Sequence, residues 1–246
     1  MTPNEVRRMF AEIAPKYDFL NHLLSFNIDR WWRRTLRKRL ASVLERHDAK
    51  ILDLCCGTGD VLLNLQRVAK GTLYGADFCH PMLVAAREKG ARALFEADAL
   101  TLPIASNALD AITVAFGFRN LADYAAGLVE LHRVLKPGGV LAILEFSHPR
   151  GLLMRAAYGF YSRALLPAVG TLISGSREAY AYLPNSIRKF PQAEELRQWM
   201  NTSGFPETRY ELLTGGIAAL HLGTKSGSGR VCQPSLDVIA KTEISH

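Results

Sequence analysis

The sequence predicts an α/β fold with a mostly parallel sheet and helices on both faces. Three observations predict it. Short apolar runs alternate with helical patterns from residue 50 onward. A glycine-containing turn follows the first of these runs, and two strand-like runs close the pattern near residue 224. This alternation is typical of βαβ units, in which each helix returns the chain to the same end of the sheet.

Residues 1–48 have a helical pattern, with apolar positions three or four apart. Asn4 is the candidate cap of the first helix and Pro15 a candidate breaker. In the later part of this segment the expected buried stripe is Trp31, Leu36, Leu40 and Val43.

Strand-like and helical runs then alternate. The strand-like runs are ILDLCCG from 51, TLYGADF from 72, ALFEADA from 93, LDAITVAF from 109 and VLAILEFS from 140. The helical patterns between them are VLLNLQRVA, HPMLVAAREKG and YAAGLVELHRVLKPGG, the last ending in residues that stop a helix and turn the chain. The sheet is therefore expected to be Rossmann-like, with helices on both faces.

The last third of the chain completes the predicted sheet. A partly helical insertion over residues 151–190 carries several tyrosines, which suit a lid or simple core packing, and AEELRQWMNTSG restores a helix. The runs ETRYELL and IAALHLGT flank Thr214 and two glycines, so they predict an antiparallel hairpin and bring the expected strands to seven. The predicted domains are thus a helical segment, 1–48, and an α/β domain, 49–225. Residues 226–246 lack periodicity and are expected to be disordered.

Composition restricts the class of protein. No apolar run approaches the roughly 20 residues that span a bilayer, and no secretory signal begins the chain, so a cytoplasmic location is expected. Four scattered cysteines fit neither a zinc site nor a disulfide framework, so no metal is expected and the thiols are expected to be reduced. The net charge of +7 is concentrated in residues 30–39, RWWRRTLRKR. This stretch suits nucleic acid, an anionic membrane surface or a solvated helix face, and the last is favoured.

The segment Ile51–Asp60, ILDLCCGTGD, carries the clearest signal of a ligand site. Gly57 and Gly59 allow a tight turn and close approach of a ligand. Position 62 is leucine where a dinucleotide-binding turn has its third glycine, which disfavours NAD. Asp53 at the strand end would repel a pyrophosphate, but it suits the cationic amino-acid part of S-adenosylmethionine (SAM).

Two further aspartates follow the next two strands. Asp77 ends the second run, about twenty residues on, where a carboxylate accepts hydrogen bonds from ribose hydroxyls. Asp98 ends the third run, beside Ala99, where an acid can accept from the adenine amine. Each aspartate alone could be a turn former or helix cap. Three acids at three successive strand ends favour a SAM site in an open crevice.

Several segments together resemble the C-methyltransferases of menaquinone and ubiquinone biosynthesis, the UbiE/MenG type. They are DLCCGTGD, AEIAPKYDFLNHLLSFNIDRWWRR, FGFRNLADY, RVLKPGG and TGGIAALHLG, within residues 8–225. The resemblance implies the class I SAM-dependent methyltransferase fold and methylation of a ring carbon of a polyprenylated hydroquinol. It implies SAM contacts at Thr58, Asp77, Asp98 and Ala99. Two positions depart from the family pattern: Ala115 replaces a serine of some members, and His148 stands at a varied position and is not expected to be a base.

Ring methylation requires stabilisation of a developing phenolate, and Arg119 is the candidate for that electrostatic role. Its guanidinium stays protonated, so it is not a free base. Asn120 and Tyr17 are candidates to hold the quinol oxygen or a water, with turn capping or packing as the alternative.

The resemblance also indicates the partners. The menaquinone branch, with demethylmenaquinol as acceptor, is preferred, and a 2-methoxy-6-polyprenyl-1,4-benzoquinol of the ubiquinone branch is the alternative. Peripheral contact with a membrane and a homodimer are compatible with the sequence, whereas nucleic acid is not expected. Two rivals remain: a SAM enzyme acting on RNA or another acceptor, and a binding module without chemistry.

Overall fold

The structure, a computed structural model, describes residues 2–14, 22, 25–149, 151, 159 and 177–227. Within these residues the chain forms one seven-stranded sheet in the order β3-β2-β1-β4-β5-β7-β6. The strands are β1 (Lys50–Leu54), β2 (Thr72–Asp77), β3 (Leu94–Glu96), β4 (Leu109–Ala115), β5 (Leu135–Phe146), β6 (Arg209–Leu213) and β7 (Ala218–Thr224). Strands β1 to β5 are parallel, whereas β7 is antiparallel to both β5 and β6. The predicted seven-stranded, mostly parallel sheet and its terminal hairpin are therefore confirmed.

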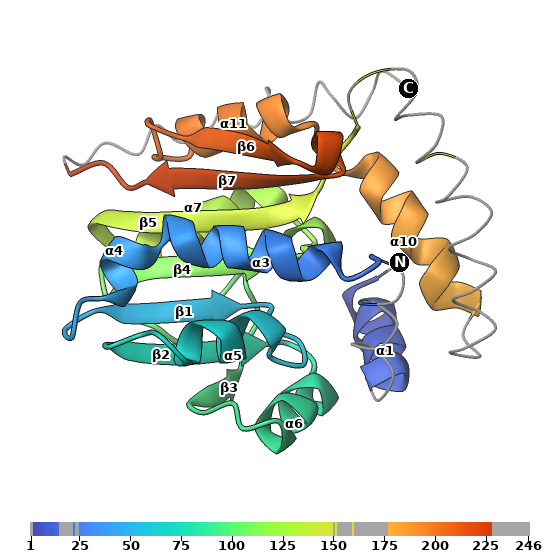
Figure 1. Cartoon of the computed structure of the whole chain (residues 1–246), viewed down its shortest axis with the longest axis horizontal. Helices are drawn as coiled ribbons and strands as arrows, with labels where there is room; N and C mark the ends of the chain where they lie inside the picture. Colours follow the sequence, from blue (N-terminus) through green and yellow to red (C-terminus); the bar gives the residue numbers. More distant parts are fainter. Residues whose placement is uncertain are drawn as a thin grey trace.

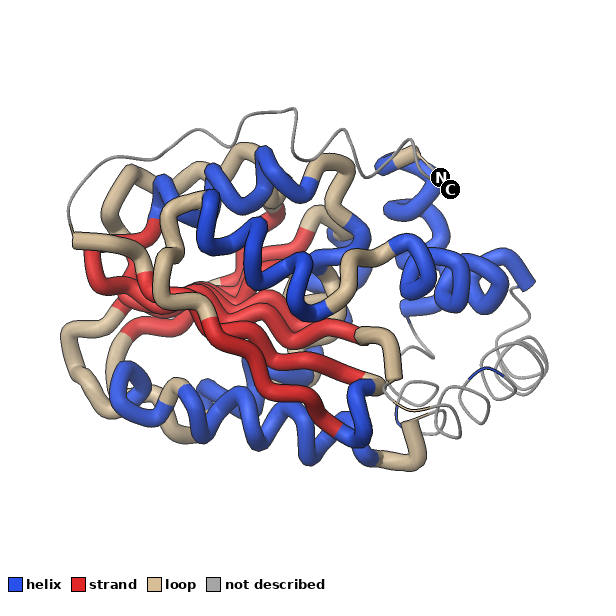
Figure 2. Tube along the Cα trace, turned by 90° about the horizontal axis from the view of Figure 1, so that it is seen from above, coloured by secondary structure: helices blue, strands red, loops and turns tan. Residues whose placement is uncertain are grey.

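Helices cover both faces of the sheet (Figures 1 and 2). Their bounds are α1 (Pro3–Ile13), α3 (Ile28–Arg39), α4 (Ala41–Leu44), α5 (Asp60–Gln66), α6 (His80–Glu88), α7 (Tyr124–Val134), α10 (Arg177–Lys189) and α11 (Ala193–Thr202), with short 3-10 turns η2 (Phe118–Asn120) and η4 (Thr214–Gly216). In Figure 1, α3 and α5 lie in front of the sheet and α7 and α11 lie behind it. The helix α1 lies beside α10 and α6, at the end of the sheet where the parallel strands finish.

Alternating side chains of the strands build two separate cores. Leu52, Leu54 and Ile112 face α7 and α11. Ile51, Ala111 and Ala142 are on the opposite face, against Trp32 and Leu36 of α3. Both faces are buried, which explains why the strands are near-continuous apolar runs rather than alternating ones.

The N-cap of helix α1 lies two residues earlier than expected. Thr2, not Asn4, is its N-cap: the Thr2 side chain accepts from the amide of Glu5, whose carboxylate accepts from the amide of Thr2. This reciprocal capping box satisfies two amides, and Pro3 then occupies a position that needs no amide donor. Pro15, the predicted breaker, lies outside the described residues.

The buried stripe of α3 also differs from the prediction. Trp31 is 50% exposed, whereas Trp32 is 3% exposed and takes the inner position with Leu36, Leu40 and Val43. The indole of Trp32 donates a hydrogen bond to Thr214 Oγ1 at 2.8 Å, and its ring packs against Phe116 and Phe146. With two adjacent tryptophans, the helical period fits either one, and only these partners decide which is buried.

The turn before β5 is shorter than predicted. Helix α7 ends at Val134, and Leu135 already pairs with Leu109. The register with β4 then shifts, and Ala111 pairs with Val140. The Lys136–Gly139 segment is therefore an irregular part of β5 rather than a loop before it.

Candidate active site

The candidate site lies at the switch point of the sheet. Strands β1 and β4 are neighbours, and the connections from them leave in opposite directions, β1 toward β2 and β4 toward β5. In open α/β sheets such a point leaves a crevice at the carboxyl ends of the strands. Asp53 of β1 is paired in register with Thr113 of β4, and the Thr113 hydroxyl donates to Asp53 Oδ1 at 2.5 Å.

Asp53 is a buried carboxylate with a neutral partner. It is 1% exposed, and burial raises its pKa from 3.8 to about 7. Its second oxygen, Oδ2, makes no hydrogen bond of normal geometry within the described part of the chain. A buried carboxylate of this kind is stabilised by a cation. The ammonium group of SAM fits that requirement.

The glycine turn connects β1 to α5. Gly59 has a φ of +86°, which favours glycine, and a Cβ there would lie in a tight contact, 3.1 Å from the Cβ of Ala86 in α6. Gly57 has a φ of +54° and faces open space. A ligand could therefore approach the backbone of Gly57 closely.

Leucine at position 62 does not prevent close packing of α5 on the sheet. A Cβ on Gly75 of β2 would lie 2.5 Å from Leu62 Cδ2. The glycine that makes room is thus on the strand instead of the helix. The missing third glycine of the turn is compensated within the fold, while Asp53 still disfavours a dinucleotide.

Asp77 holds the glycine turn in place. Its Oδ2 accepts from the Gly57 amide at 2.8 Å, and its Oδ1 accepts from the Cys79 amide at 2.9 Å. Asp77 is only 6% exposed, and burial raises its pKa to about 6. The sequence predicts that Asp77 stands in an open crevice, and this expectation is wrong, because its side chain is almost fully buried. Each oxygen still has a lone pair for a ribose hydroxyl.

The remaining predicted SAM contacts lie around this turn. Strand β3 ends at Glu96, so Asp98 lies two residues beyond the strand instead of ending it. Asp98 is exposed, and its Oδ1 accepts from the Leu100 amide at 2.9 Å. Ala99 and Thr58 are buried. Asp98 is free to reorient toward an adenine amine at little cost, because it has one local bond.

The cysteines near the turn are free thiols, as expected for the three that the structure describes, Cys55, Cys56 and Cys79. Burial raises the pKa of all three. They are therefore protonated at neutral pH and poor nucleophiles. Cys232 lies outside the described residues.

Arg119 lies in η2, directly after β4, and it is paired. Its Nη1 donates to Glu145 Oε1 at 2.8 Å and to the Phe116 carbonyl, and its guanidinium lies 5.3 Å from the centre of the Phe146 ring. The two side chains are 5% and 1% exposed. Pairing with a carboxylate is what an architectural arginine shows. A direct role of Arg119 in catalysis stays a prediction. The ion pair offers an alternative, namely that Arg119 stabilises the fold.

Asn120 contacts a residue that sequence reasoning missed. The hydroxyl of Tyr182, on α10, donates to Asn120 Oδ1 at 3.0 Å. Burial raises the pKa of Tyr182, so the phenol keeps its proton at neutral pH. The pair joins the end of β4 to the helix that covers it. Tyr17, the third predicted catalytic residue, lies outside the described residues.

A second polar cluster, also not predicted, joins α3 to the glycine turn. Arg33 Nη1 lies 2.6 Å from Asp29 Oδ2 and 2.8 Å from Asp60 Oδ2, directly after Gly59. His22 Nδ1 lies 2.8 Å from Asp29 Oδ2. The segment NIDRWWRRTLRKR shows an acid and arginines, but nothing in its pattern indicates which arginine turns inward.

The fold and the arrangement of these carboxylates around a glycine turn define a class I, SAM-dependent methyltransferase. The chain belongs to the ubiE/COQ5 methyltransferase family, whose sequence model matches residues 1–225.

Three relatives are similar over most or all of their length. The chain is 50% identical over 223 residues to a demethylmenaquinone methyltransferase of Thermus thermophilus, covering 88% of this chain and 100% of that protein. It is 46% identical to the protein of the same name from Deinococcus radiodurans, over 89% of this chain and 92% of the relative. A protein of Geotalea uraniireducens named ubiquinone/menaquinone biosynthesis C-methyltransferase UbiE is 43% identical, over 90% and 96%.

Solved structures share the fold at much lower identity. A SAM-dependent methyltransferase of Thermotoga maritima, described as a possible histamine N-methyltransferase, superposes with a TM-score of 0.61 at 18% identity, covering 89% of this chain and 99% of the other. The [4+2]-cyclase SpnF gives a TM-score of 0.60 at 17% identity, covering 92% and 97%. One fold thus carries different chemistries, so the acceptor must be argued from the site and the family.

Proposed function

We propose that this chain transfers the methyl group of SAM to a ring carbon of demethylmenaquinol, giving menaquinol. The observation that carries the proposal is the similarity, over nearly the whole chain, to two proteins named demethylmenaquinone methyltransferase. The methoxy-polyprenyl benzoquinol of the ubiquinone branch is a second candidate, supported by the name of the Geotalea uraniireducens relative.

The binding of SAM is assigned to residues around the glycine turn. Asp53 supplies a buried negative charge for the ammonium group, and its raised pKa indicates that a cation is needed to hold it ionised. Asp77 fixes the turn and has lone pairs for the ribose hydroxyls. Thr58 in the glycine turn is also assigned to SAM, and Asp98 and Ala99, which follow β3, are assigned to its adenine side. Bound SAM supplies an electrophilic methyl group on a positively charged sulfur.

The acceptor ring is assigned to the side of the crevice beyond β4. A hydroquinol carbon becomes nucleophilic when its neighbouring hydroxyl loses a proton, so groups that favour the phenolate lower the barrier. The amide nitrogen of Asn120 can donate a hydrogen bond to the acceptor oxygen, while the phenol of Tyr182, which donates its proton to Asn120 Oδ1, holds that amide in place. Arg119 contributes positive charge, reduced by Glu145, and its hydrogen bonds hold the η2 turn that presents Asn120.

The acceptor also bears on location. No described helix is long and apolar enough to cross a membrane. Because a polyprenyl tail resides in the bilayer, we assign the protein to the cytoplasm, in peripheral contact with the inner face of the membrane.

The test is methyl transfer from labelled SAM to three acceptors offered separately: demethylmenaquinol, the methoxy-polyprenyl benzoquinol and total RNA. Label in the menaquinol product at the highest kcat/KM supports the proposal. A higher kcat/KM with the benzoquinol would move the assignment to the ubiquinone branch, and label in RNA alone would overturn both.

A further inference from the structure

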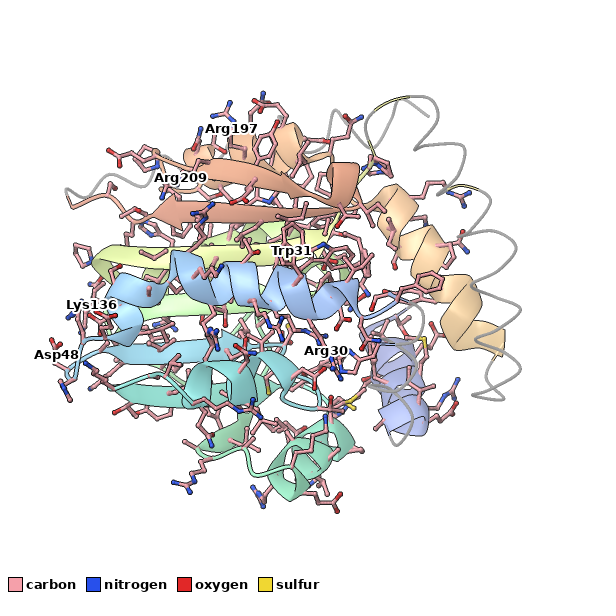
Figure 3. The ribbon with its side chains drawn as sticks, viewed as in Figure 1. Arg30, Trp31, Asp48, Lys136, Arg197 and Arg209 are labelled. Carbon is pink, nitrogen blue, oxygen red and sulfur yellow. The ribbon has the colours of Figure 1, made fainter. Side chains whose placement is uncertain are left out.

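The outward side of α3 combines exposed apolar side chains with cations that form no ion pair among the described residues. We call it the α3 outer face; it consists of Phe26, Ile28, Arg30, Trp31, Arg34, Arg37 and Lys38. Phe26 is 69% exposed, Trp31 50% and Ile28 37%. Figure 3 labels Arg30 and Trp31 near the end of α3 that lies toward α1. Large apolar side chains set among cations on a surface mark an interaction site more often than isolated ones do.

The orientation of this face is fixed from the other side of the helix. Trp32 is hydrogen-bonded to Thr214, and Arg33 is held between Asp29 and Asp60. Trp31 could turn inward only if Trp32 and Arg33 left these partners. Its exposure is therefore built into the fold.

The cations of the face have no carboxylate partners in the described part of the chain. Arg30, Arg34, Arg37 and Lys38 form no ion pair there, although Arg33 does. The one acid of α3, Asp29, is 4% exposed and points inward. Among the described residues, the face is thus a patch of positive charge without paired carboxylates.

The turn that precedes α3 also contributes an exposed apolar side chain to the α3 outer face. Phe26 has a φ of +51° and Asn27 a φ of +60°, so two consecutive residues adopt the left-handed region. Asparagine tolerates this region, but a bulky phenylalanine seldom adopts it. In this conformation Phe26 lies at the surface, five residues before Trp31.

We propose that the α3 outer face docks on an anionic membrane surface, with Phe26, Ile28 and Trp31 at the depth of the headgroups and the cations against the lipid phosphates. An amphipathic aromatic ring and long cationic side chains are the types that favour this boundary. RNA would attract the cations equally, but it would leave Ile28 and Phe26 without an apolar environment.

The position of the face gives docking a purpose. Its aromatic end lies toward α1 and α10, at the end of the sheet where the parallel strands finish (Figure 1). Docking there brings the candidate site to the bilayer that holds a prenyl tail. This purpose rests on the proposed function, whereas the docking itself does not.

The experiment measures binding of the full chain to vesicles without quinol, made of phosphatidylcholine alone or with phosphatidylglycerol. The parent should bind only the anionic vesicles. Arg30→Gln/Arg34→Gln should lower the partition coefficient about 10- to 30-fold, because each cation near an anionic surface contributes a factor of about five. Trp31→Ala should lower it roughly fivefold by removing apolar contact.

Two matched controls separate a specific face from net charge. Arg87→Gln/Arg92→Gln removes the same charge from exposed positions on and just after α6, and Val84→Ala removes a 41% exposed apolar side chain of α6. Both should retain parental binding within about twofold. Equal losses in the α3 and α6 variants would overturn the inference. So would RNA that binds as tightly as the anionic vesicles and is insensitive to Trp31→Ala.

A second assay separates this inference from the proposed function. The α3 variants should lose activity on long-chain demethylmenaquinol in anionic vesicles but keep it on a short-chain quinol in solution. A parent that methylates the short-chain quinol yet ignores vesicles would overturn docking alone. A parent that binds vesicles and methylates neither quinol would overturn the proposed function alone.

Discussion

Two carboxylates buried to the same degree lie on either side of the switch point of the sheet, but their hydrogen-bond partners differ. Asp53 on β1 and Glu145 on β5 are each 1% exposed. Glu145 accepts from the guanidinium of Arg119 and from two backbone amides. Asp53 accepts from the neutral hydroxyl of Thr113. Burial raises the pKa of both acids, that of Asp53 to about 7 and that of Glu145 in spite of its pairing with Arg119.

The difference indicates which side of the crevice awaits a ligand. A buried charge with its own counter-ion belongs to the architecture, because removing the partner leaves an uncompensated charge. A buried acid without a counter-ion is costly in the ligand-free protein, and a cationic ligand removes that cost. We therefore expect Asp53 to face the cation of a ligand, and the Arg119–Glu145 pair to stabilise the fold beside the proposed acceptor region.

The largest effect is expected at Arg119, in the buried ion pair with Glu145. Arg119→Ala should lower the free energy of unfolding by about 3 to 5 kcal/mol, the usual cost of leaving a buried partner unpaired. If Arg119 also acts on the reaction, the methylation rate falls at least about a hundredfold while SAM affinity stays within a few fold. Denaturant unfolding, calorimetry with SAM and steady-state kinetics measure the three quantities.

Two variants distinguish the roles of Arg119. Arg119→Lys keeps the charge without the planar fork, so partial activity would indicate charge stabilisation and none a bidentate role. Glu145→Gln leaves the Arg119 charge without its counter-ion; a rate that holds or rises favours an electrostatic role, and a fall favours positioning. If Arg119→Ala methylates quinol at the parental rate, Arg119 has no role in the reaction.

The next largest effect is expected at Asp53, on the proposed SAM side of the crevice. Asp53→Asn keeps the acceptor for Thr113 and removes the buried charge, so the ligand-free protein should gain roughly 2 to 4 kcal/mol of stability at pH 8. The pKa of Asp53 is raised on folding, so its favourable contribution is complete below about pH 4 and disappears as pH rises through 7. The gain from Asp53→Asn should therefore shrink as pH falls and vanish near pH 4. Thermal unfolding of the two proteins across pH measures it.

The same substitution should weaken SAM binding by roughly 1.5 to 3 kcal/mol, the value of a hydrogen bond to a charged group. Parental SAM affinity should itself weaken as pH falls below about 7, and Asp53→Asn should flatten that dependence. A variant that loses both stability and affinity would contradict the assignment of Asp53 to a ligand cation.

A smaller effect is expected at Asp77. Asp77→Ala should weaken SAM binding by roughly 1 to 3 kcal/mol and, because two amides lose their acceptor, should also lower stability by about 1 to 2 kcal/mol. Asp77→Asn keeps one acceptor oxygen and should recover part of the stability. Unchanged SAM affinity in calorimetry would remove Asp77 from the ribose site.

The smallest effect is expected at Asp98. Asp98→Ala should weaken SAM binding by at most about 1 kcal/mol and change stability by less than about 0.5 kcal/mol, because the residue is exposed. A SAM analogue without the adenine amino group should bind parent and variant equally. A difference that persists with that analogue would place Asp98 elsewhere.

The position of the ligand crevice could be predicted from the sequence because it depends on local pattern. Apolar runs fix the strands, Gly57 and Gly59 fix the turn, and Asp53 and Asp77 follow from their places in those strands. Carboxyl ends of parallel strands meet at one edge, so strand order along the chain already groups these residues.

The tertiary structure decided what depends on partners distant in the sequence. Trp32 rather than Trp31 is buried because Thr214, 182 residues away, accepts its indole hydrogen bond. Arg119 is paired because β5 brings Glu145 beside η2, and Asn120 meets Tyr182 across 62 residues. Periodicity and residue type specify which side chains can be buried or charged. Which of them find a partner depends on the distances that folding sets, and these distances pair Glu145 with Arg119 but leave Asp53 with a neutral partner.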